Sequence, residues 1–380
     1  IDKVLRPSRG DGVPIVCHRV DDEIAEAEFV VNQIRTLEFK HPELNWGHFA
    51  ILYRTNAQSR TFEEVLTRFS IPYQVVGGLR FYDRREIKDV LAYLRAIANP
   101  ADTVSLKRVI NVPRRGIGKS TLEKLDQGAM TLGVPLWEIL NDDTSVKTLA
   151  GRSAKSVLSF TRLIRNWQEK QDNYKASEIV QGVLEDSGYI SDLKEKGTDD
   201  DLERIQNVQE LYNAVLQFED ENEETQSLQN FLANAALASD LDGLEASQER
   251  VSLMTLHSSK GLEFPVVFLV GLEQGLFPNF RSLEDPAATE EERRLCYVGI
   301  TRAKERLFIS HARMRRLYGN REPAMPSLFL TELPHDYLEL NNAAAIPQRW
   351  TKSVREQKEA ARASSAENRP GTHENDWSVG

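Results

Sequence analysis

The spacing of apolar residues divides the chain into segments of different texture. In the first segment, apolar positions at helical spacing predict helices over 23–37 and 61–69, while continuous apolar runs at 49–53 and 73–76 predict buried strands. Strands that alternate with helices favour a parallel sheet with helices on its faces.

From Glu86 onward the pattern changes to one helix after another. Apolar residues recur at helical spacing, beginning with Ile87, Val90, Leu91, Leu94 and Ile97. Strand character returns only at Val251, where the runs VSLMTL and PVVFLV precede a helix around EERRLCYVGI. An α/β texture that stops and later resumes indicates one sheet domain interrupted by an inserted helical domain.

We therefore predict an α/β fold whose parallel sheet domain comprises 1–83 and 250–335, with an inserted all-α domain at 84–249. Beyond Pro334 the chain is rich in Ala, Ser, Asn and Glu and has few large apolar residues. Such a composition cannot bury enough apolar surface to fold, so we predict a disordered tail over 336–380.

Composition favours a globular protein without disulfides or membrane spans. A chain of 380 residues, 40% of them hydrophobic, can bury a large core. Cys17 and Cys296 lie far apart without metal-ligand spacing, so we expect no disulfide framework, no metal site and a reducing cytoplasm. No apolar run reaches the roughly 20 residues of a membrane span, and the start has no signal-peptide core. The abrupt beginning at Ile1, without Met, is typical of an excised fragment.

The net charge of −10 argues against a uniformly basic nucleic-acid binder, but the charge is unevenly distributed. Residues 79–119 contain ten Lys or Arg and four Asp or Glu, whereas 219–249 contain nine acidic residues and no Lys or Arg. Because salt screens charges over about 8–10 Å, a local basic patch can attract phosphates on an acidic protein. An ordinary solvated helix face is the alternative interpretation.

The sequence RGIGKST at 115–121 superficially matches a phosphate-binding P-loop. That motif requires G-x-x-x-x-G-K-[ST], and Pro113 occupies the position of its first glycine. Pro113 is also a poor end for the buried strand that must precede such a loop. Similarly, Asp21-Asp22-Glu23 looks like a magnesium-binding pair but precedes an amphipathic helix, which favours N-terminal capping. The chain therefore lacks the motifs of a complete NTPase.

A tight turn between two helices is the better interpretation of the glycine-rich segment. Backbone amides of such a turn, and the start of the helix that follows, can hold a backbone phosphate of DNA. The predicted contacts are Arg114, Arg115, Gly116, Gly118 and Lys119. A plain inter-helix turn with exposed basic residues is the alternative.

Polar residues stand at the ends of the predicted elements in 251–313. His257 and Lys260 follow one strand, Glu263 precedes the next, and Arg302 ends the helix. Side chains at such ends usually face a cleft rather than a core, and the layout is typical of a nucleotide or phosphate site.

This block resembles motifs V and VI of the UvrD/PcrA/Rep family of superfamily 1A DNA helicases. Similar stretches run in order over about 49–333, through FAILYRTNAQSR, IPYQVVGGLRFYDRREIKDVLAYLRAIANP, VPRRGIG, TLHSSKGLEFPVVFLVGLEQGLFP and EERRLCYVGITRAKERL. The resemblance implies the second RecA-like domain of such an enzyme, without its own Walker A motif, and its helical insertion. The first RecA-like domain and the motif IV arginine would be absent.

By this resemblance, Arg302 is the arginine finger that reaches the γ-phosphate of ATP, and Glu263 accepts a hydrogen bond from the ribose. A guanidinium can stabilise charge on the transferred phosphoryl group, whereas a carboxylate suits a sugar hydroxyl. The alternatives are an ion pair of Arg302 with a glutamate in 290–292, and a capping or salt-bridge role for Glu263.

The resemblance also implies contacts with single-stranded DNA. They involve Arg54, Asn56, His257, Lys260 and Tyr318. Alternatively, His257 forms its hydrogen bonds within the protein, and Tyr318 packs against neighbouring side chains. Asn279 stands where some relatives have a DNA-contacting histidine, and asparagine, unlike histidine, cannot carry a positive charge.

Together these features imply the C-terminal half of an ATP-dependent 3′–5′ DNA helicase of repair or replication. ATP and Mg²⁺ would bind only together with the first RecA-like domain, so the fragment alone would not hydrolyse ATP. The implied partners are single-stranded DNA, junctions with duplex, the missing N-terminal half, and repair or transcription proteins of the bacterial nucleoid. A non-catalytic DNA- or protein-binding module and a helicase–nuclease subunit are the alternatives.

Overall fold

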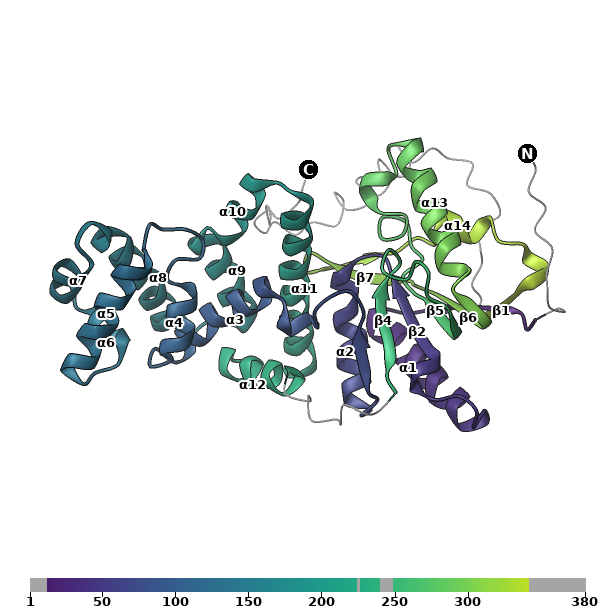
Figure 1. The fold of residues 1–380 in the computed structure, drawn as a ribbon, viewed down its shortest axis with the longest axis horizontal. Helices are drawn as coiled ribbons and strands as arrows, with labels where there is room; N and C mark the ends of the chain where they lie inside the picture. Colours follow the sequence, from purple (N-terminus) through teal and green to yellow (C-terminus); the bar gives the residue numbers. More distant parts are fainter. Residues whose placement is uncertain (1–11, 224–225, 240–248, 342–380) are drawn as a thin grey trace. The chain divides into compact units, whose positions relative to one another are not determined.

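The computed structural model describes residues 12–223, 226–239 and 249–341. The chain divides into two compact units, one combining Ile1–Arg80 with Leu244–Gly380 and the other comprising Phe81–Gly243 (Figure 1). Two distant parts of the sequence therefore build the first unit, and one continuous segment builds the second.

A parallel sheet forms the centre of the first unit. In spatial order its strands are β3 (Tyr73–Val75), β4 (Val251–Thr255), β2 (Phe49–Tyr53), β5 (Phe264–Leu269), β6 (Ala303–Ala312), β1 (Ile15–Val20) and β9 (Leu338–Asn341). From β3 to β5, strands that precede the helical unit alternate with strands that follow it. Neither half of the sequence can therefore complete this sheet alone.

Helices cover both faces of the sheet. They are α1 (Glu23–Lys40), α2 (Ser59–Arg68), α13 (Pro286–Ile300) and α14 (Leu328–Thr331). Ile34 of α1 and Leu66 of α2 belong to the buried cluster around Ile51, whereas Cys296 of α13 belongs to the cluster around Leu52. Successive residues of β2 thus serve opposite cores, as expected for a strand with both faces covered.

Asp22 caps the first helix. Its Oδ1 accepts hydrogen bonds from the backbone N–H groups of Ile24 and Ala25, at 3.1 and 2.9 Å. Two of the amides that lack a partner inside the helix are thereby satisfied. The capping interpretation of the acidic pair is confirmed.

The second unit is helical. Its helices are α3 (Arg85–Ala98), α4 (Thr103–Val109), α5 (Lys119–Leu132), α6 (Leu136–Asn141), α7 (Asp143–Ala150), α8 (Ala154–Lys170), α9 (Ala176–Ser187), α10 (Tyr189–Lys196), α11 (Asp199–Glu221) and α12 (Leu228–Ser239). No strand occurs among its described residues. The predicted fold class, a parallel α/β domain interrupted by helices, is confirmed.

The sheet extends further along the chain than the sequence predicts. β9 pairs in parallel with β1, with Leu338 opposite Ile15, so the prediction of disorder from residue 336 is wrong for 338–341. Leu340 is exposed, so backbone hydrogen bonds rather than apolar burial define this edge strand. The rest of the predicted tail, from residue 342, lies outside the described residues. In the described part of the chain, no helix is long and apolar enough to cross a membrane.

Candidate functional site

The loops that follow β2, β3 and β4 meet at the carboxyl edge of the sheet. Gly77 has a φ of +75°, and a Cβ there would lie 2.9 Å from Oγ of Ser258. At Gly78 an added Cβ would lie 3.8 Å from Oδ1 of Asn56. Only glycine tolerates both this backbone conformation and this close approach at position 77. Three neighbouring strands therefore bring their polar loops into one surface.

Arg54 is held by Glu292, one of the glutamates that the sequence analysis considered only as a partner of Arg302. Its Nε lies 3.0 and 2.9 Å from the two carboxylate oxygens of Glu292, and its Nη2 lies 2.6 Å from Oε1. Glu292 belongs to α13, is only 5% exposed and also accepts a hydrogen bond of 3.1 Å from the backbone N–H of Asn279. One buried carboxylate thus links the loops after β2 and β5.

His257 and Lys260 are exposed on the turn after β4. The turn is fixed by Thr255, whose Oγ1 accepts from the backbone N–H of Ser258 at 3.3 Å. Desolvation lowers the pKa of His257, and the charge of Arg54 lowers it further. The imidazole is therefore neutral at neutral pH and offers one N–H donor rather than a positive charge.

Tyr318 lies at the tip of a hairpin formed by β7 (Met314–Leu317) and β8 (Asn320–Pro323). It has a φ of +51°, Gly319 has a φ of +85°, and the tyrosine is 45% exposed. A two-residue turn with both φ angles positive matches the natural twist of a hairpin. An exposed aromatic ring at such a tip can stack on a base.

A buried ionic cluster anchors this hairpin. Arg315 of β7 donates from Nη2 and Nε to the carboxylate of Glu273, at 2.7 and 2.8 Å, and also pairs with Glu26 of α1. Glu26 accepts a 2.6 Å hydrogen bond from Oγ of Ser310 as well. Because Glu273 lies in the loop after β5, the cluster fixes that loop and the hairpin to the same helix.

Glu263 and Arg302 lie at the opposite, amino edge of the sheet, immediately before β5 and β6. The Arg302 guanidinium donates to the carbonyls of Leu262 and Val298, at 2.8 and 2.9 Å, and to Oγ1 of Thr301 at 3.0 Å. Glu263 is 55% exposed, and its Oε2 lies 3.8 Å from Nζ of Lys304. The structure therefore separates the predicted polar residues into two groups on two edges.

The alternative ion pair of Arg302 with a nearby glutamate is absent from the described residues. Each glutamate of 290–292 has another arginine as its partner; the pairs are Glu290 with Arg293, Glu291 with Arg294, and Glu292 with Arg54. Of the alternatives considered for Arg302 and Glu263, the described part of the structure shows only a salt bridge of Glu263, and its 3.8 Å separation from Lys304 is long for such a pair.

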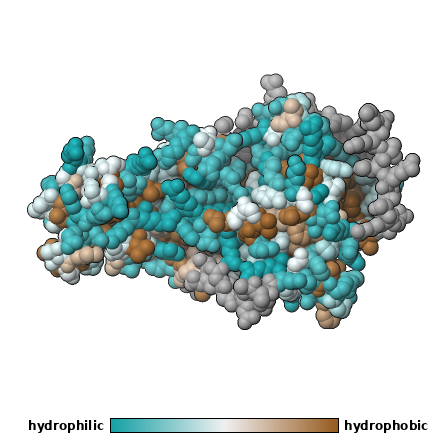
Figure 2. Space-filling view, viewed as in Figure 1, coloured by the Kyte–Doolittle hydropathy of each residue, from teal (hydrophilic) through white to brown (hydrophobic). Residues whose placement is uncertain are grey.

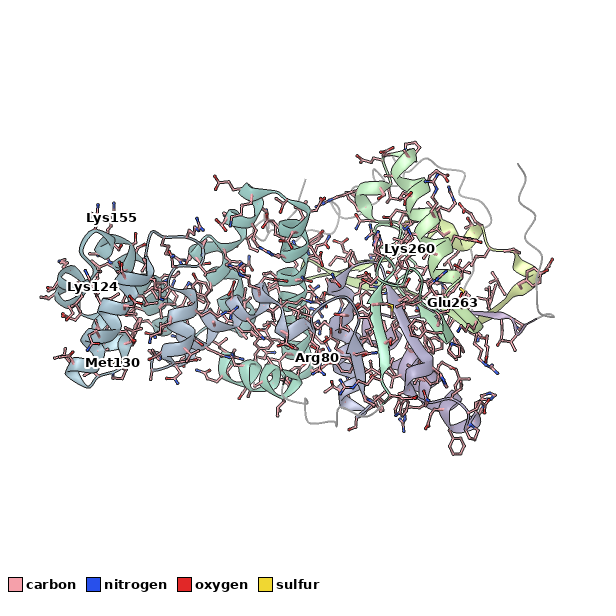
Figure 3. All side chains as sticks on the ribbon, viewed as in Figure 1. Arg80, Lys124, Met130, Lys155, Lys260 and Glu263 are labelled. Carbon is pink, nitrogen blue, oxygen red and sulfur yellow. The ribbon has the colours of Figure 1, made fainter. Side chains whose placement is uncertain are left out.

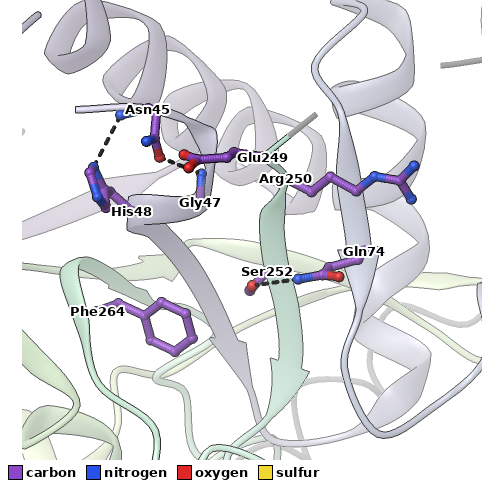
Figure 4. Close-up of a pocket in the computed structure, with 8 residues that line it drawn as sticks. All are labelled: Asn45, Gly47, His48, Gln74, Glu249, Arg250, Ser252 and Phe264. Carbon is purple, nitrogen blue, oxygen red and sulfur yellow. Dashed lines mark hydrogen bonds between the residues drawn. The ribbon is translucent and has the colours of Figure 1, made fainter. Parts of the chain in front are cut away.

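A hollow of about 590 Å³ opens at the amino edge, among the starts of β2, β4 and β5 (Figure 4). Its lining consists of Asn45, Gly47, His48, Gln74, Glu249, Arg250, Ser252 and Phe264. Phe264 directly follows Glu263, so the hollow adjoins the predicted nucleotide edge. Within the described residues, no cluster of three or more His, Cys, Asp or Glu side chains could hold a metal ion.

In the helical unit, hydrogen bonds of the Arg115 side chain hold the glycine-rich turn against its neighbours. Its Nη2 donates to the hydroxyl of Tyr93 at 2.6 Å and to the carbonyl of Ser187 at 3.1 Å, and its Nη1 donates to the carbonyl of Val112 at 3.0 Å. The guanidinium also lies over the ring of Phe160. This side chain therefore holds the turn together, and its predicted phosphate contact stays a prediction.

The other predicted residues of the turn face solvent. Gly116 has a φ of +74°, Gly118 is the N-cap of α5, Arg114 is exposed, and the Lys119 side chain is 91% exposed. The segment before the turn follows the helix α4 and contains no strand. The rejection of a P-loop is therefore supported, because such a loop requires a preceding strand.

Comparison with known proteins gives consistent matches. The family profile of the UvrD-like helicase C-terminal domain matches residues 1–314. The chain is 40% identical over 381 residues to the ATP-dependent DNA helicase PcrA of Staphylococcus epidermidis, a match that covers 100% of this chain and 51% of that protein. It is 40% identical over 343 residues to PcrA of Bacillus subtilis, with 89% and 46% covered, and 43% identical over 331 residues to DNA helicase II of Salmonella typhimurium, with 87% and 46% covered. The chain thus spans about half the length of these curated relatives.

Proposed function

Because the chain belongs to the UvrD-like helicase C-terminal family, we propose that it is the C-terminal half of an ATP-dependent 3′–5′ DNA helicase. Its relatives are named DNA helicases and are about twice as long, which supports a first RecA-like domain that supplies the P-loop and the magnesium carboxylates. Mg²⁺ and ATP would then bind between two domains, and cleft closure would drive stepwise movement on one strand.

The DNA-binding part of this proposal rests on one observation: the loops after β2, β3 and β4 lie next to one another. Asn56, His257 and Lys260 lie on these loops, and Tyr318 supplies an exposed ring. Hydrogen-bond donors along a sheet edge, together with a ring on which a base can stack, suit a single strand read without sequence preference. Arg54 would donate to the strand from Nη1, because its Nε and Nη2 are bonded to Glu292.

Arg302 and Glu263 are the residues that would face the nucleotide. Three hydrogen bonds to the protein use three of the five N–H donors of Arg302, and two remain for phosphate oxygens. The exposed Glu263 carboxylate can accept from a ribose hydroxyl. When bound, ATP with Mg²⁺ supplies the phosphoryl group; Arg302 would stabilise the charge that develops on it.

In the helical unit, the turn with Arg114, Gly116, Gly118 and Lys119 would hold the backbone of the duplex ahead of the single strand. We place the protein in DNA repair or replication at the bacterial nucleoid, since the relatives are bacterial DNA helicases.

Strand separation tests the proposal. The chain joined to its natural upstream region would be mixed with ATP and a labelled duplex that carries either a 3′ or a 5′ single-stranded tail. We expect unwinding of the 3′-tailed duplex only, and no unwinding by the chain alone. Unwinding from the 5′ tail would overturn the polarity, whereas binding without ATP-dependent unwinding by the joined protein would favour a non-catalytic binding module.

A further inference from the structure

We propose that Arg152, in the turn before α8, and Lys155, in the first turn of α8, form a second contact with duplex DNA beside the turn at 114–119. The inference rests on the proposed function and extends it, since it adds a surface from a different part of the sequence. Both side chains are exposed. The surface formed by Arg114, Lys119, Arg152 and Lys155 is called the basic patch below.

One serine joins the two parts of the basic patch. Oγ of Ser153 donates to the carbonyl of Gly116 at 3.0 Å and lies 3.4 Å from Oγ1 of Thr121 in α5. Ser153 occupies the N-cap position of α8, where its backbone is already helical (φ −84°, ψ −1°) and its hydroxyl makes no capping hydrogen bond. Figure 3 labels Lys155 together with Lys124 and Met130 of α5 in the helical unit.

The charges of the patch are largely free to meet phosphates. Residues 144–168 contain five Lys or Arg and no Asp or Glu. Among the described residues, Arg114, Arg152 and Lys155 form no ion pair, and Lys119 lies 3.7 Å from an exposed Glu123, a pair worth little in water. A duplex presents roughly one negative charge per 1.7 Å of its axis, so a patch of this kind can meet several phosphates at once.

A double-stranded backbone fits the basic patch better than a single strand does. Binding of single strands relies on exposed aromatic rings that stack on bases. The exposed aromatic side chain in the described part of the helical unit, Tyr174, lies beyond the far end of α8. The face of this unit visible in Figure 2 is mainly hydrophilic, with apolar residues in small separate groups. The charge of the patch, and its distance along the chain from the exposed ring of Tyr174, therefore point to phosphates of a duplex.

Salt-dependent binding tests the inference. The full-length protein would be titrated with a duplex carrying a 3′ single-stranded tail, and separately with the tail alone, across a series of salt concentrations. We expect Arg152→Ala/Lys155→Ala to weaken binding of the tailed duplex about tenfold and to reduce its salt slope by about 2, because roughly one counterion is released per phosphate contact. Affinity for the tail alone should not change.

Two further variants make the outcome specific. Lys175→Ala removes one positive charge beyond the other end of α8, roughly 25 Å away at 1.5 Å per helical residue, and should bind like the wild type. Arg114→Ala/Lys119→Ala tests the turn itself. If this variant loses duplex affinity while Arg152→Ala/Lys155→Ala does not, the second contact is disproved and the proposed turn contact stands. If neither variant loses affinity, the proposed duplex contact fails as well.

Discussion

At the scale of single residues, Gly77 sets the distance between two loops of the candidate site. Alanine at 77 would adopt a strained backbone with φ of +75° and place its Cβ 2.9 Å from Ser258. We expect Gly77→Ala to lower the free energy of unfolding in urea by about 1–3 kcal/mol. Gly78→Ala is the matched control, because its nearest neighbour would be 3.5 Å away and its φ is not positive. Equal losses for the two variants would contradict this explanation.

His311 provides a pH-dependent term in stability. Burial lowers its pKa from 6.5 to about 4, and within the described residues its Nδ1 has no hydrogen-bond partner. The unfolded chain therefore binds a proton more readily, so stability is lost as pH falls from about 6.5 to 4. The loss attributable to His311 is of order 3 kcal/mol, at about 1.4 kcal/mol per pKa unit.

Unfolding in urea at several pH values measures this effect. His311→Gln cannot titrate in this range, so its stability should fall less steeply below pH 6.5 than that of the wild type. Parallel curves for the two proteins would show that His311 is protonated as easily in the folded as in the unfolded state.

The sequence nominates candidate site residues but does not indicate which side chains they contact in the fold. Arg54 was expected to contact single-stranded DNA, and the sequence did not indicate that Glu292, 238 positions away, pairs with it. Arg115 was expected at the surface of its turn, yet it reaches Tyr93 and the end of α9. Long-range pairs of this kind depend on tertiary packing, which periodicity and motif spacing do not contain.

At the scale of elements, the buried cluster around Arg315 fixes the β7–β8 hairpin. Removing the guanidinium in Arg315→Met would leave the carboxylates of Glu26 and Glu273 buried without a counter-charge. We expect a loss of about 3–5 kcal/mol in the free energy of unfolding. Arg313→Met is the control, since the pair of Arg313 with Asp21 is exposed and should contribute less than about 1 kcal/mol.

The pH dependence of the Arg315→Met variant has a defined sign. Burial raises the pKa of Glu273 even in the wild type, against the opposing effect of Arg315. Without the arginine, protonation of Glu273 relieves its buried charge, so the loss of stability should be smaller at pH 5 than at pH 8. A larger loss at pH 5 would contradict the role of the cluster.

Elements with a strong apolar pattern are the ones that sequence predicts well. β2 is buried along its whole length, and its residues 49–53 were predicted as a strand. β9 has half-exposed side chains, and its pairing with β1 depends on backbone hydrogen bonds, which leave almost no trace in composition. The helical insertion was predictable because apolar residues of its first helix recur at helical spacing, although the structure buries most positions of that helix, Glu86 and Asp89 included.

At the scale of the whole molecule, α13 joins the two edges of the sheet domain. Glu292 of this helix holds Arg54 at the carboxyl edge, and Arg302 follows the end of the helix at the amino edge. A helix of 15 residues is about 22 Å long, enough to connect loops at opposite ends of the strands. Because this helix connects the proposed DNA contacts with the proposed nucleotide contacts, a shift of the helix at one site would be transmitted to the other site.

The most direct test of the central claim is ATPase activity stimulated by single-stranded DNA. It would be measured for the chain alone and for the chain joined to its natural upstream region, each as the wild type and as Arg302→Ala. We expect hydrolysis only by the joined wild type and a loss of about 10³-fold or more in kcat for the joined Arg302→Ala protein, with its folding unchanged by circular dichroism. Full activity of the joined Arg302→Ala protein, or ATP turnover by the chain alone, would contradict the account.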